Sequence, residues 1–328
     1  MGDALNLVIG ILLLLVGGTV LVRGASAIAS GLGISPMVVG LTVVAIGTSS
    51  PELVVKMLGA LQDQSAIAFG NIVGSNIANL GLVLGAVALI TPISIEGQLV
   101  RRELPLLILA TTVVLVMTLD PTLRGSAAML DRSDGVILFL LFSIFVYVSV
   151  LDVIRQRRDP LLLGAQNLPV PEVEAVRSRD WAFTLAGITG LALGGHLTIT
   201  SGVALADTLG LPKTVIGIAI VAVGTSLPEL VTSVIAALRR EADLAVGNVV
   251  GSNLFNGLFV LPAGAILAPI PVPMGGVGDV VLSLLFAVAL IPVFIIGRSL
   301  MGRYSGGTFL LVYAAYLLYR TLTGGPSL

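Results

Sequence analysis

The sequence lacks cysteine and is poor in charged and aromatic residues. None of its 328 residues is cysteine, which excludes disulfide bonds, thiolate metal sites and a cysteine nucleophile. Charged residues make up 11% and aromatic residues 5%, without a basic stripe or a cluster of stacking aromatics, so nucleic acid is not expected as a partner. Hydrophobic residues make up 56%, which is more apolar surface than one water-soluble core can bury. The composition therefore predicts an integral membrane protein.

The N-terminus also lacks the features of a secretory signal peptide. It carries Asp3 where such a signal has basic residues, and no small-residue cleavage site follows the first apolar run. We therefore expect this run to be the first membrane-spanning helix. A helix needs about 20 predominantly apolar residues to cross a bilayer, and ten segments are candidates, the fourth of them short. They cover residues 5–30, 35–60, 66–90, 104–119, 135–153, 181–206, 212–238, 243–267, 277–296 and 306–321.

The chain contains two copies of one sequence, offset by 177 residues. Residues 29–93 align with residues 206–270 without a gap, and about 30 of the 65 aligned positions are identical. Each half holds five expected spans, so the second half must enter the membrane from the opposite side. The sequence thus predicts an all-α polytopic membrane protein of ten transmembrane helices, arranged as two inverted five-helix repeats. Residues 1–154 would form the first repeat, 155–180 a polar cytoplasmic linker and 181–328 the second repeat.

Arginine and lysine are distributed unevenly among the expected loops. The loops that follow odd-numbered spans carry 12 of the 17 basic residues. Basic residues favour the cytoplasmic side of a membrane. These loops are therefore expected in the cytoplasm, and both termini on the extracytoplasmic side.

Two polar motifs occur in each copy at the same spacing. The first, Gly-Thr-Ser-x-Pro-Glu, ends at Glu52 and at Glu229, and the second, Gly-Ser-Asn-x-x-Asn, ends at Asn79 and at Asn256. An ionisable side chain at membrane depth costs about 2.5–3.5 kcal/mol on insertion scales, so it needs a partner or a water-filled cavity. Lys56, one turn after Glu52, has only a serine as its counterpart in the second copy. A permanent salt bridge thus explains at most one of the two glutamates.

The residues around both glutamates are typical of a site for a hard cation. Thr48 and Thr225 lie four residues before the glutamates, on the same helical face. The proline before each glutamate lacks the N–H that would bond the carbonyl four residues back, which leaves that carbonyl free. Carboxylate, carbonyl and hydroxyl oxygens bind Ca²⁺, and similar neutral oxygens suit Na⁺. The second motif adds further oxygens at the same four-residue spacing, from Ser75 with Asn79 and from Ser252 with Asn256.

Simpler structural roles compete with ion binding at several of these positions. A serine or threonine hydroxyl in a helix often bonds a carbonyl of its own preceding turn, although the duplication and the neighbouring glutamates favour a site here. Glycines of both motifs serve close helix packing equally well. Inter-helix hydrogen bonding is favoured for the remaining asparagines of the motifs, which are Asn71, Asn76, Asn248 and Asn253.

The paired motifs resemble the alpha repeats of the cation/calcium antiporter superfamily, and the chain is similar in size to its prokaryotic sodium/calcium exchangers. The resemblance covers both halves. It implies ten helices, an inverted repeat and alternating access, in which the first and sixth spans slide against the other eight. It further implies a secondary antiporter rather than an enzyme, which exchanges Ca²⁺ for Na⁺ in the cell membrane of a prokaryote without a cofactor or an obligate protein partner.

The resemblance also implies a set of ligands. Glu52 and Glu229 would be the central Ca²⁺ ligands, together with the backbone carbonyls of Thr48 and Thr225. The flanking sodium sites would be completed by Ser49 with Ser75, by Ser226 with Ser252, and by the carbonyls of Ala45 and Ala222.

Asn79 and Asn256 would border the central site, where family members often carry one aspartate. Two carboxylates and two amides leave the site a formal charge of −2, which balances one Ca²⁺ or two Na⁺. A third Na⁺ would make the exchange electrogenic. The number of counter-ions therefore stays open at this point.

Two other functions use the same residues. A proton is the alternative counter-ion for Ca²⁺ or another divalent cation, and His196, the sole histidine, is a candidate for such coupling. A helix-packing imidazole bonded to a neighbouring hydroxyl is the favoured role for His196, and the paired Thr and Ser oxygens favour sodium. A cation channel is disfavoured, because inverted halves place the site at the midplane of one chain rather than in a ring of repeated filters.

Overall fold

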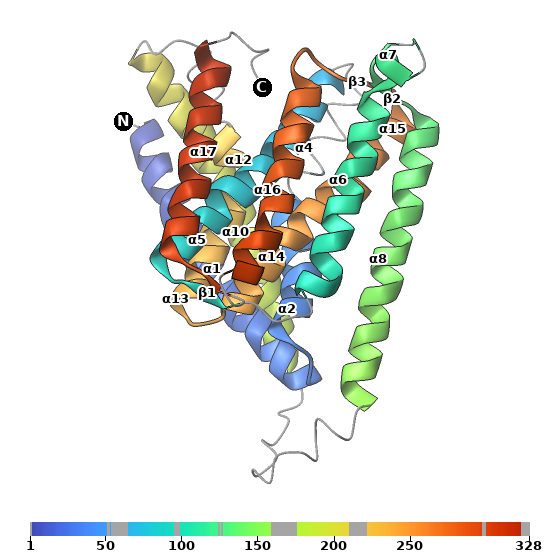
Figure 1. Ribbon diagram of the computed structural model, residues 1–328. Coiled ribbons are helices and arrows are strands. Elements are labelled where there is room, and N and C mark those ends of the chain that lie inside the picture. Colours follow the sequence, from blue (N-terminus) through green and yellow to red (C-terminus); the bar gives the residue numbers. More distant parts are fainter. Residues whose placement is uncertain are drawn as a thin grey trace.

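The structure is a computed structural model of the chain. It describes residues 2–50, 53, 65–94, 99–123, 125, 127–158, 176–209, 222–296 and 300–322. These residues form a bundle of helices with four two-residue strands (Figure 1).

The first half contains helices of very different length. They are α1 (Gly2–Leu32), α2 (Pro36–Val39), the π-helical turn η1 (Gly40–Val44), which continues as α-helix over residues 45–50, α4 (Ser65–Ala78), η2 (Asn79–Leu84), α5 (Gly85–Ile90), η3 (Leu99–Glu103), α6 (Leu104–Thr118), α7 (Asp120–Leu123) and α8 (Arg132–Arg158). Its strands are β1 (Ile93–Ser94) and β2 (Met129–Leu130).

The second half repeats much of this order. Its helices are α10 (Ser178–Thr208), α12 (Ala222–Thr225), α13 (Leu227–Leu238), α14 (Ala242–Phe255), η5 (Asn256–Val260), α15 (Leu261–Leu267), α16 (Gly276–Ile296) and α17 (Arg303–Leu322). Its strands are β3 (Ile270–Pro271) and β4 (Leu300–Met301). A shift of 177 residues carries α4, η2, α5 and β1 onto α14, η5, α15 and β3.

The prediction of a helical membrane protein is confirmed. Described helices fall within each of the ten segments expected from the sequence. Within the described residues, six stretches are long and apolar enough to cross a membrane: Gly2–Leu32, Phe69–Ile90, Arg132–Leu151, Ser178–Thr208, Ala242–Leu267 and Gly276–Ile295. Pro36–Ser50 and Leu227–Leu238 are shorter apolar helices.

The segment between α8 and α10 is shorter than the linker expected over residues 155–180. Helix α8 continues to Arg158, and α10 already begins at Ser178. Arginine is a good helix former and is favoured in a last helical turn, where it complements the helix dipole. At the other end, the Asp180 carboxylate accepts a hydrogen bond from the Arg177 backbone N–H at 2.9 Å, which fixes the start of α10. Residues 159–175 lie outside the described part of the chain.

Helices α1 and α10 pack against each other along their length through glycines. A Cβ atom at Gly187 would lie 2.5 Å from the Leu21 backbone nitrogen, and one at Gly17 would lie 2.8 Å from the Leu191 nitrogen. Towards the other end of α1, a Cβ at Gly24 would lie 2.7 Å from the Thr184 nitrogen. Successive positions of α1 thus meet earlier positions of α10, so the two helices run antiparallel. Such close backbone approach requires glycine.

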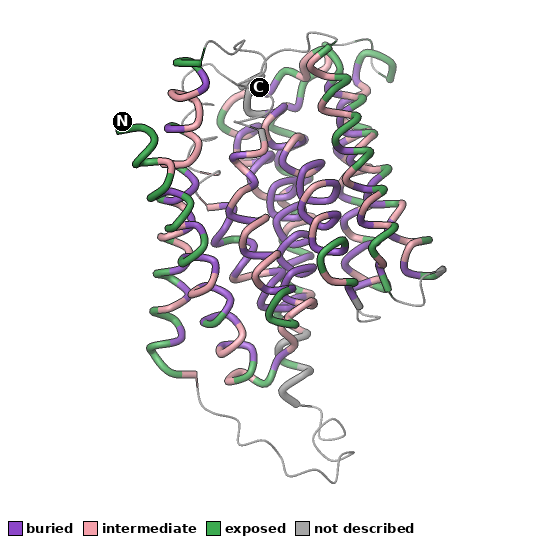
Figure 2. The backbone as a smooth tube through the Cα atoms, turned by 90° about the vertical axis from the view of Figure 1, so that its left-hand side faces the viewer, coloured by how far each residue is buried: buried purple, intermediate pink, exposed green. Residues whose placement is uncertain are grey.

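The centre of the bundle is formed by α14 and its counterpart α4. Every residue of α14 from Leu244 to Phe255 is buried, and the backbone coloured by burial shows this buried centre (Figure 2). The strands pair across the halves, β1 with β4 and β2 with β3, both antiparallel. The described part of α1 begins and that of α17 ends at the same end of the molecule, while α8 ends at the opposite one (Figure 1).

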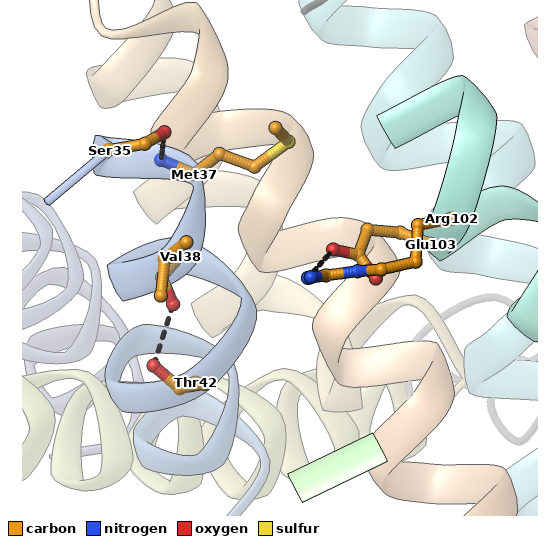
Figure 3. A network of polar contacts seen from close by, with 6 residues as sticks. All are labelled: Ser35, Met37, Val38, Thr42, Arg102 and Glu103. Atoms are coloured by element: carbon orange, nitrogen blue, oxygen red, sulfur yellow. Dashed lines mark hydrogen bonds and ion pairs between the residues drawn. The ribbon is translucent and has the colours of Figure 1, made fainter. Parts of the chain in front are cut away.

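The start of the helix over residues 36–50 is fixed by a capping serine and a proline in the first turn. The Ser35 hydroxyl accepts a hydrogen bond from the Met37 N–H at 3.2 Å, and Pro36 occupies the first turn, where its missing N–H costs nothing. The Thr42 hydroxyl donates to the Val38 carbonyl at 2.7 Å. Figure 3 shows these contacts together with the Arg102 to Glu103 ion pair before α6.

Candidate ion-binding site

The sequence-predicted site residues gather in the buried centre of the bundle. Eight of them are buried polar side chains, contributed by the helix over residues 36–50, α4 with η2, α13 with the turn before it, and α14 with η5: Thr48, Ser49, Ser75, Asn79, Ser226, Glu229, Ser252 and Asn256. Ala45 is buried beside them, Thr225 is half-buried at the end of α12, and Ala222 begins α12. Glu52 lies outside the described residues.

Glu229 is held against the first half of the chain by a serine. Its carboxylate accepts a hydrogen bond from the Ser49 hydroxyl at 3.0 Å, and only 1% of Glu229 is exposed. It stands in the first turn of α13, directly after Pro228, where a helix N-terminus favours negative charge. Sequence alone did not predict this contact, because Ser49 and Glu229 are 180 positions apart.

The helix that leads to Glu229 is interrupted by a turn three residues before it. Helix α12 ends at Thr225, Ser226 forms a turn, and α13 begins at Leu227. The expected disruption at the proline is thereby confirmed in the second half. Thr225 and Glu229 therefore belong to two helices and not to one continuous helix as expected, and Pro228 cannot donate the backbone hydrogen bond that would continue the turn. The equivalent Pro51 lies outside the described residues.

A second chain of hydrogen bonds joins Thr48 to the second half. Its hydroxyl lies 3.2 Å from the Asn248 side-chain oxygen and 3.3 Å from the Ala45 carbonyl, so one proton is shared between two acceptors. The Asn248 amide nitrogen in turn donates to the Ser233 hydroxyl at 3.0 Å. Thr48 therefore combines a bond to its own preceding turn with an inter-helix bond. Ser233 was not identified from the sequence; the available signal is that it occupies the position of Lys56 in the first copy.

Four asparagines form a network across the two halves. The Asn79 amide nitrogen donates to the Asn253 side-chain oxygen at 3.0 Å, and the Asn256 nitrogen donates to the Asn76 side-chain oxygen at 3.2 Å. The Asn253 nitrogen donates to the Asn76 backbone carbonyl at 3.1 Å. The preference for inter-helix hydrogen bonding is thus confirmed for Asn76 and Asn253, as it is for Asn248.

This network determines which way the Asn79 amide points. A backbone carbonyl only accepts, so the Asn253 nitrogen must face Asn76 and the Asn253 oxygen must face Asn79. Asn79 then has to turn its nitrogen to Asn253 and its own oxygen away. The Asn256 amide is turned in the same sense by Asn76.

Several buried oxygens at this place are left without a hydrogen bond. Four of them make no hydrogen bond to any described residue, and these are Asn79 Oδ1, Asn256 Oδ1, Ser226 Oγ and Ser252 Oγ. An unsatisfied buried polar atom costs about 1–3 kcal/mol, and native proteins leave few of them. Amide, hydroxyl and carboxylate oxygens are the donor set that hard cations use.

Three π-helical turns accompany these residues. The turn η2 begins at Asn79, η5 begins at the equivalent Asn256, and η1 ends directly before Ala45. A π-helical turn inserts one extra residue into a helix and is frequent at functional sites. No periodicity in the sequence predicted these turns.

His196 is not among the buried polar residues of this cluster. It is on the exposed face of α10, and its backbone carbonyl accepts a hydrogen bond from Thr200 at 2.8 Å. The expected helix-packing imidazole is therefore wrong, because α10 turns this position away from its partner α1.

The fold and the polar cluster together define a class of protein. Interrupted helices that bring buried oxygens together inside a duplicated membrane bundle are typical of secondary transporters.

Comparisons with known proteins identify the family. A family model described as sodium/calcium exchanger protein matches residues 3–151 and 180–322. The chain therefore belongs to the sodium/calcium exchanger family, whose members are secondary transporters rather than enzymes.

Individual relatives are similar to this protein over most of the chain. The CaxA protein of Alkalimonas amylolytica is 40% identical over 265 residues, which are 80% of this chain and 79% of that protein. The sodium/calcium exchanger MaX1 of Methanosarcina acetivorans is 29% identical over 96% of this chain and 97% of its own length. A solved structure of the sodium-calcium exchanger NCX_Mj, soaked with 10 mM Na⁺ and no Ca²⁺, matches with a TM-score of 0.80 and 29% identity, covering 96% of this chain and 98% of that one.

Proposed function

We propose that the protein is a secondary antiporter that exchanges Ca²⁺ for Na⁺ across the membrane by alternating access. The observation that carries this proposal is the set of buried oxygens without a hydrogen bond, on Asn79, Asn256, Ser226 and Ser252, together with the buried carboxylate of Glu229. A transported cation satisfies such oxygens when it is bound and leaves them when it is released. The family and the relatives named sodium/calcium exchangers support the choice of ions.

The proposed ligands are those predicted from the sequence. Glu229 and Glu52 bind Ca²⁺ together with the carbonyls of Thr48 and Thr225, and Asn79 and Asn256 border this central position. The flanking sodium positions take hydroxyls and carbonyls from Ser49, Ser75, Ser226, Ser252, Ala45 and Ala222. Ca²⁺ and Na⁺ are cargo in this scheme, and no resident cofactor is proposed.

The finer architecture is part of the same proposal. We infer ten transmembrane helices in two inverted repeats. The asparagine network supports this arrangement, because exchanging each residue for its equivalent 177 positions away converts the Asn79 to Asn253 bond into the Asn256 to Asn76 bond. The antiparallel course of α1 and α10, which are equivalent helices, supports it as well. In this arrangement each half contributes half of the cation ligands.

The proposed location follows from the family and the basic residues. The protein spans the cell membrane of a prokaryote, with both termini on the extracytoplasmic side. The site charge of −2 from two glutamates balances one Ca²⁺ or two Na⁺, so an exchange of three Na⁺ for one Ca²⁺ would carry net charge.

Transport by purified protein in sealed vesicles tests the function. Vesicles loaded with Na⁺ and diluted into Na⁺-free buffer should take up radioactive calcium, and collapse of the Na⁺ gradient with an ionophore should stop the uptake. The proposal fails if a pH gradient drives calcium uptake while a Na⁺ gradient does not, since this would indicate a proton antiporter. Single-channel currents far above transporter turnover would instead indicate a channel.

A further inference from the structure

Helix α8 is packed against the rest of the protein along only part of its length. Near its start, a Cβ at Gly135 would lie 2.8 Å from the Ile266 side chain. One to two turns on, the rings of Phe139 and Phe142 pack on Phe259, with centroids 5.3 and 5.1 Å apart. The later part of α8 lies alongside a groove instead.

The groove has a volume of about 340 Å³ and separates α8 from α1 and from the helix over residues 36–50. Its walls are almost entirely apolar, and they are formed by Phe142, Phe145, Val146, Ser149 and Val150 of α8, Trp181 of α10, and mainly aliphatic residues of the other two helices. The Thr42 hydroxyl in the opposite wall is already bonded to the Val38 carbonyl. This volume lies within the range of about 300–1,000 Å³ that is usual for small-molecule sites, and the walls suit an alkyl chain.

The groove opens towards the surroundings of the helices. Ile46, Val146 and Val150 on its walls are 41%, 42% and 50% exposed. In a membrane-spanning chain these side chains face hydrocarbon, so an acyl chain is the molecule that reaches the groove.

Basic residues lie at the end of the molecule towards which the groove runs. Helix α8 ends in Arg155, Arg157 and Arg158, and Arg177 and Arg179 flank the start of α10. Arg155 follows Val150 by five positions, a rise of about 7.5 Å along a helix. The headgroup layer extends roughly 5–8 Å beyond the hydrocarbon core on each side. An acyl chain beside Val150 therefore has its phosphate at the level of these arginines.

We propose that this groove binds an acyl chain of an anionic phospholipid, whose headgroup lies at the level of the arginines at the end of α8 and the start of α10. Clusters of basic residues at the membrane surface bind anionic lipids by charge attraction. The bound chain packs on the same helix that carries Ala45, Thr48 and Ser49. The inference does not depend on the transported ions.

Trp181 provides a direct test, because it is the sole tryptophan of the chain and forms part of the groove wall. The protein is reconstituted into vesicles of unlabelled phosphatidylcholine that contain a small fraction of either phosphatidylglycerol or phosphatidylcholine with brominated acyl chains. Bromine quenches tryptophan fluorescence at contact. We expect stronger quenching by the brominated phosphatidylglycerol than by the brominated phosphatidylcholine at equal mole fraction.

Variants on both walls of the groove separate it from the general lipid surface. Ser149→Phe on α8 and Val43→Phe on the opposite wall fill the groove and should abolish the preference for phosphatidylglycerol. Leu140→Phe is the matched control, because Leu140 lies on α8 outside the groove and is 61% exposed. This variant should retain the preference.

Headgroup recognition is tested separately. Replacement of Arg155, Arg157 and Arg158 by glutamine should lower the preference by roughly fivefold for each arginine removed. Arg303→Gln, in an exposed arginine of α17, should leave it unchanged.

Three results would overturn the proposal. Equal quenching of the unmodified protein by both lipids excludes a preferred anionic lipid, and this comparison holds even where a filled variant does not fold. Retention of the preference in both filled variants places the lipid elsewhere. Absence of quenching together with a dimer in light scattering assigns the groove to a second copy of the chain.

Discussion

Glu229, Asn79 and Asn256 each make a hydrogen bond with the other half of the chain. The Ser49 hydroxyl holds one oxygen of Glu229 at 3.0 Å. Asn253 and Asn76 accept hydrogen bonds from the amide nitrogens of Asn79 and Asn256. The amide oxygens of Asn79 and Asn256 are left without a hydrogen bond. At this scale, Asn76 and Asn253 decide which amide atom of their neighbours is left without a hydrogen bond.

Removal of the Glu229 charge should abolish calcium exchange. Glu229→Gln leaves a divalent ion with one formal negative ligand, and affinity for Ca²⁺ depends strongly on ligand charge. We expect sodium-driven uptake of radioactive calcium to fall on the order of 100-fold or more, and the same for Glu52→Gln. Glu241→Gln, at the start of α14, is the matched control and should transport normally. Full exchange by Glu229→Gln would remove this carboxylate from the mechanism.

Aspartate should be tolerated at Asn256 but not at Asn79. In Asn256→Asp, the Asn76 amide turns over and donates to the new carboxylate, since no other hydrogen bond of its side chain is found among the described residues. In Asn79→Asp, Asn253 keeps its oxygen towards the new carboxylate, because its nitrogen is held by the Asn76 carbonyl.

The two aspartate variants are compared by calcium binding and by the counter-ion that drives transport. We expect Asn256→Asp to bind Ca²⁺ and to change its response to pH or Na⁺, and Asn79→Asp to lose at least tenfold in transport, the equivalent of about 1.4 kcal/mol. Loss of binding in Asn256→Asp, or equal behaviour of both variants, would contradict the orientation of the network.

At the scale of helices, irregular turns and close contacts position the site. The π-helical turns start at Asn79 and Asn256 in the middle of apolar segments, and α12 and α13 are separated just before Glu229. Helices α1 and α10 meet through glycines that leave no room for a side chain. The pair is therefore closely fitted.

A methyl group in the contact between α1 and α10 should destabilise the protein. In Gly187→Ala the new Cβ would lie 2.5 Å from the Leu21 backbone nitrogen, so the helices must separate. Overpacking of this kind costs about 1–3 kcal/mol, and the melting temperature in detergent should fall by several degrees. Gly278→Ala in α16 is the control, because nothing lies within 4 Å of its Cβ position. An unchanged melting temperature for Gly187→Ala would contradict the close fit.

At the scale of the whole molecule, the two halves contact each other through equivalent elements. Strand β1 pairs with β4 and its counterpart β3 pairs with β2, just as the asparagine bonds are exchanged by the repeat. Each half thus makes the same strand pairing and the same asparagine hydrogen bond to the other half. This reciprocity supports the inverted repeat that we propose.

The membrane orientation can be tested with single cysteines, since the chain has none of its own. Leu123→Cys and Met274→Cys, both at exposed positions, should react with a membrane-impermeant maleimide in intact cells. Ser178→Cys and Tyr304→Cys, which are also exposed, should react only after permeabilisation. Labelling of all four in intact cells, or the reverse pattern, would contradict the inverted topology with both termini outside.

The sequence by itself determined the membrane class, the approximate helix positions, the duplication and nearly all of the candidate site residues. These properties are local or follow from comparing the chain with itself: apolar runs mark helices, and identical motifs 177 residues apart mark positions where polar groups recur inside apolar surroundings. They required no knowledge of which residues meet in space.

Only the tertiary structure decided how those residues are paired. The Ser49 contact with Glu229, the direction of the Asn79 amide and the groove beside α8 join residues far apart in the chain, 180 positions for Ser49 with Glu229 and 174 for Asn79 with Asn253. Such contacts depend on how whole helices pack, and the exposed position of His196 depends on the face that α10 turns to α1. A motif indicates that an oxygen is present in the sequence. Only the packing of the helices determines whether that oxygen accepts a hydrogen bond from another residue or stays available to an ion.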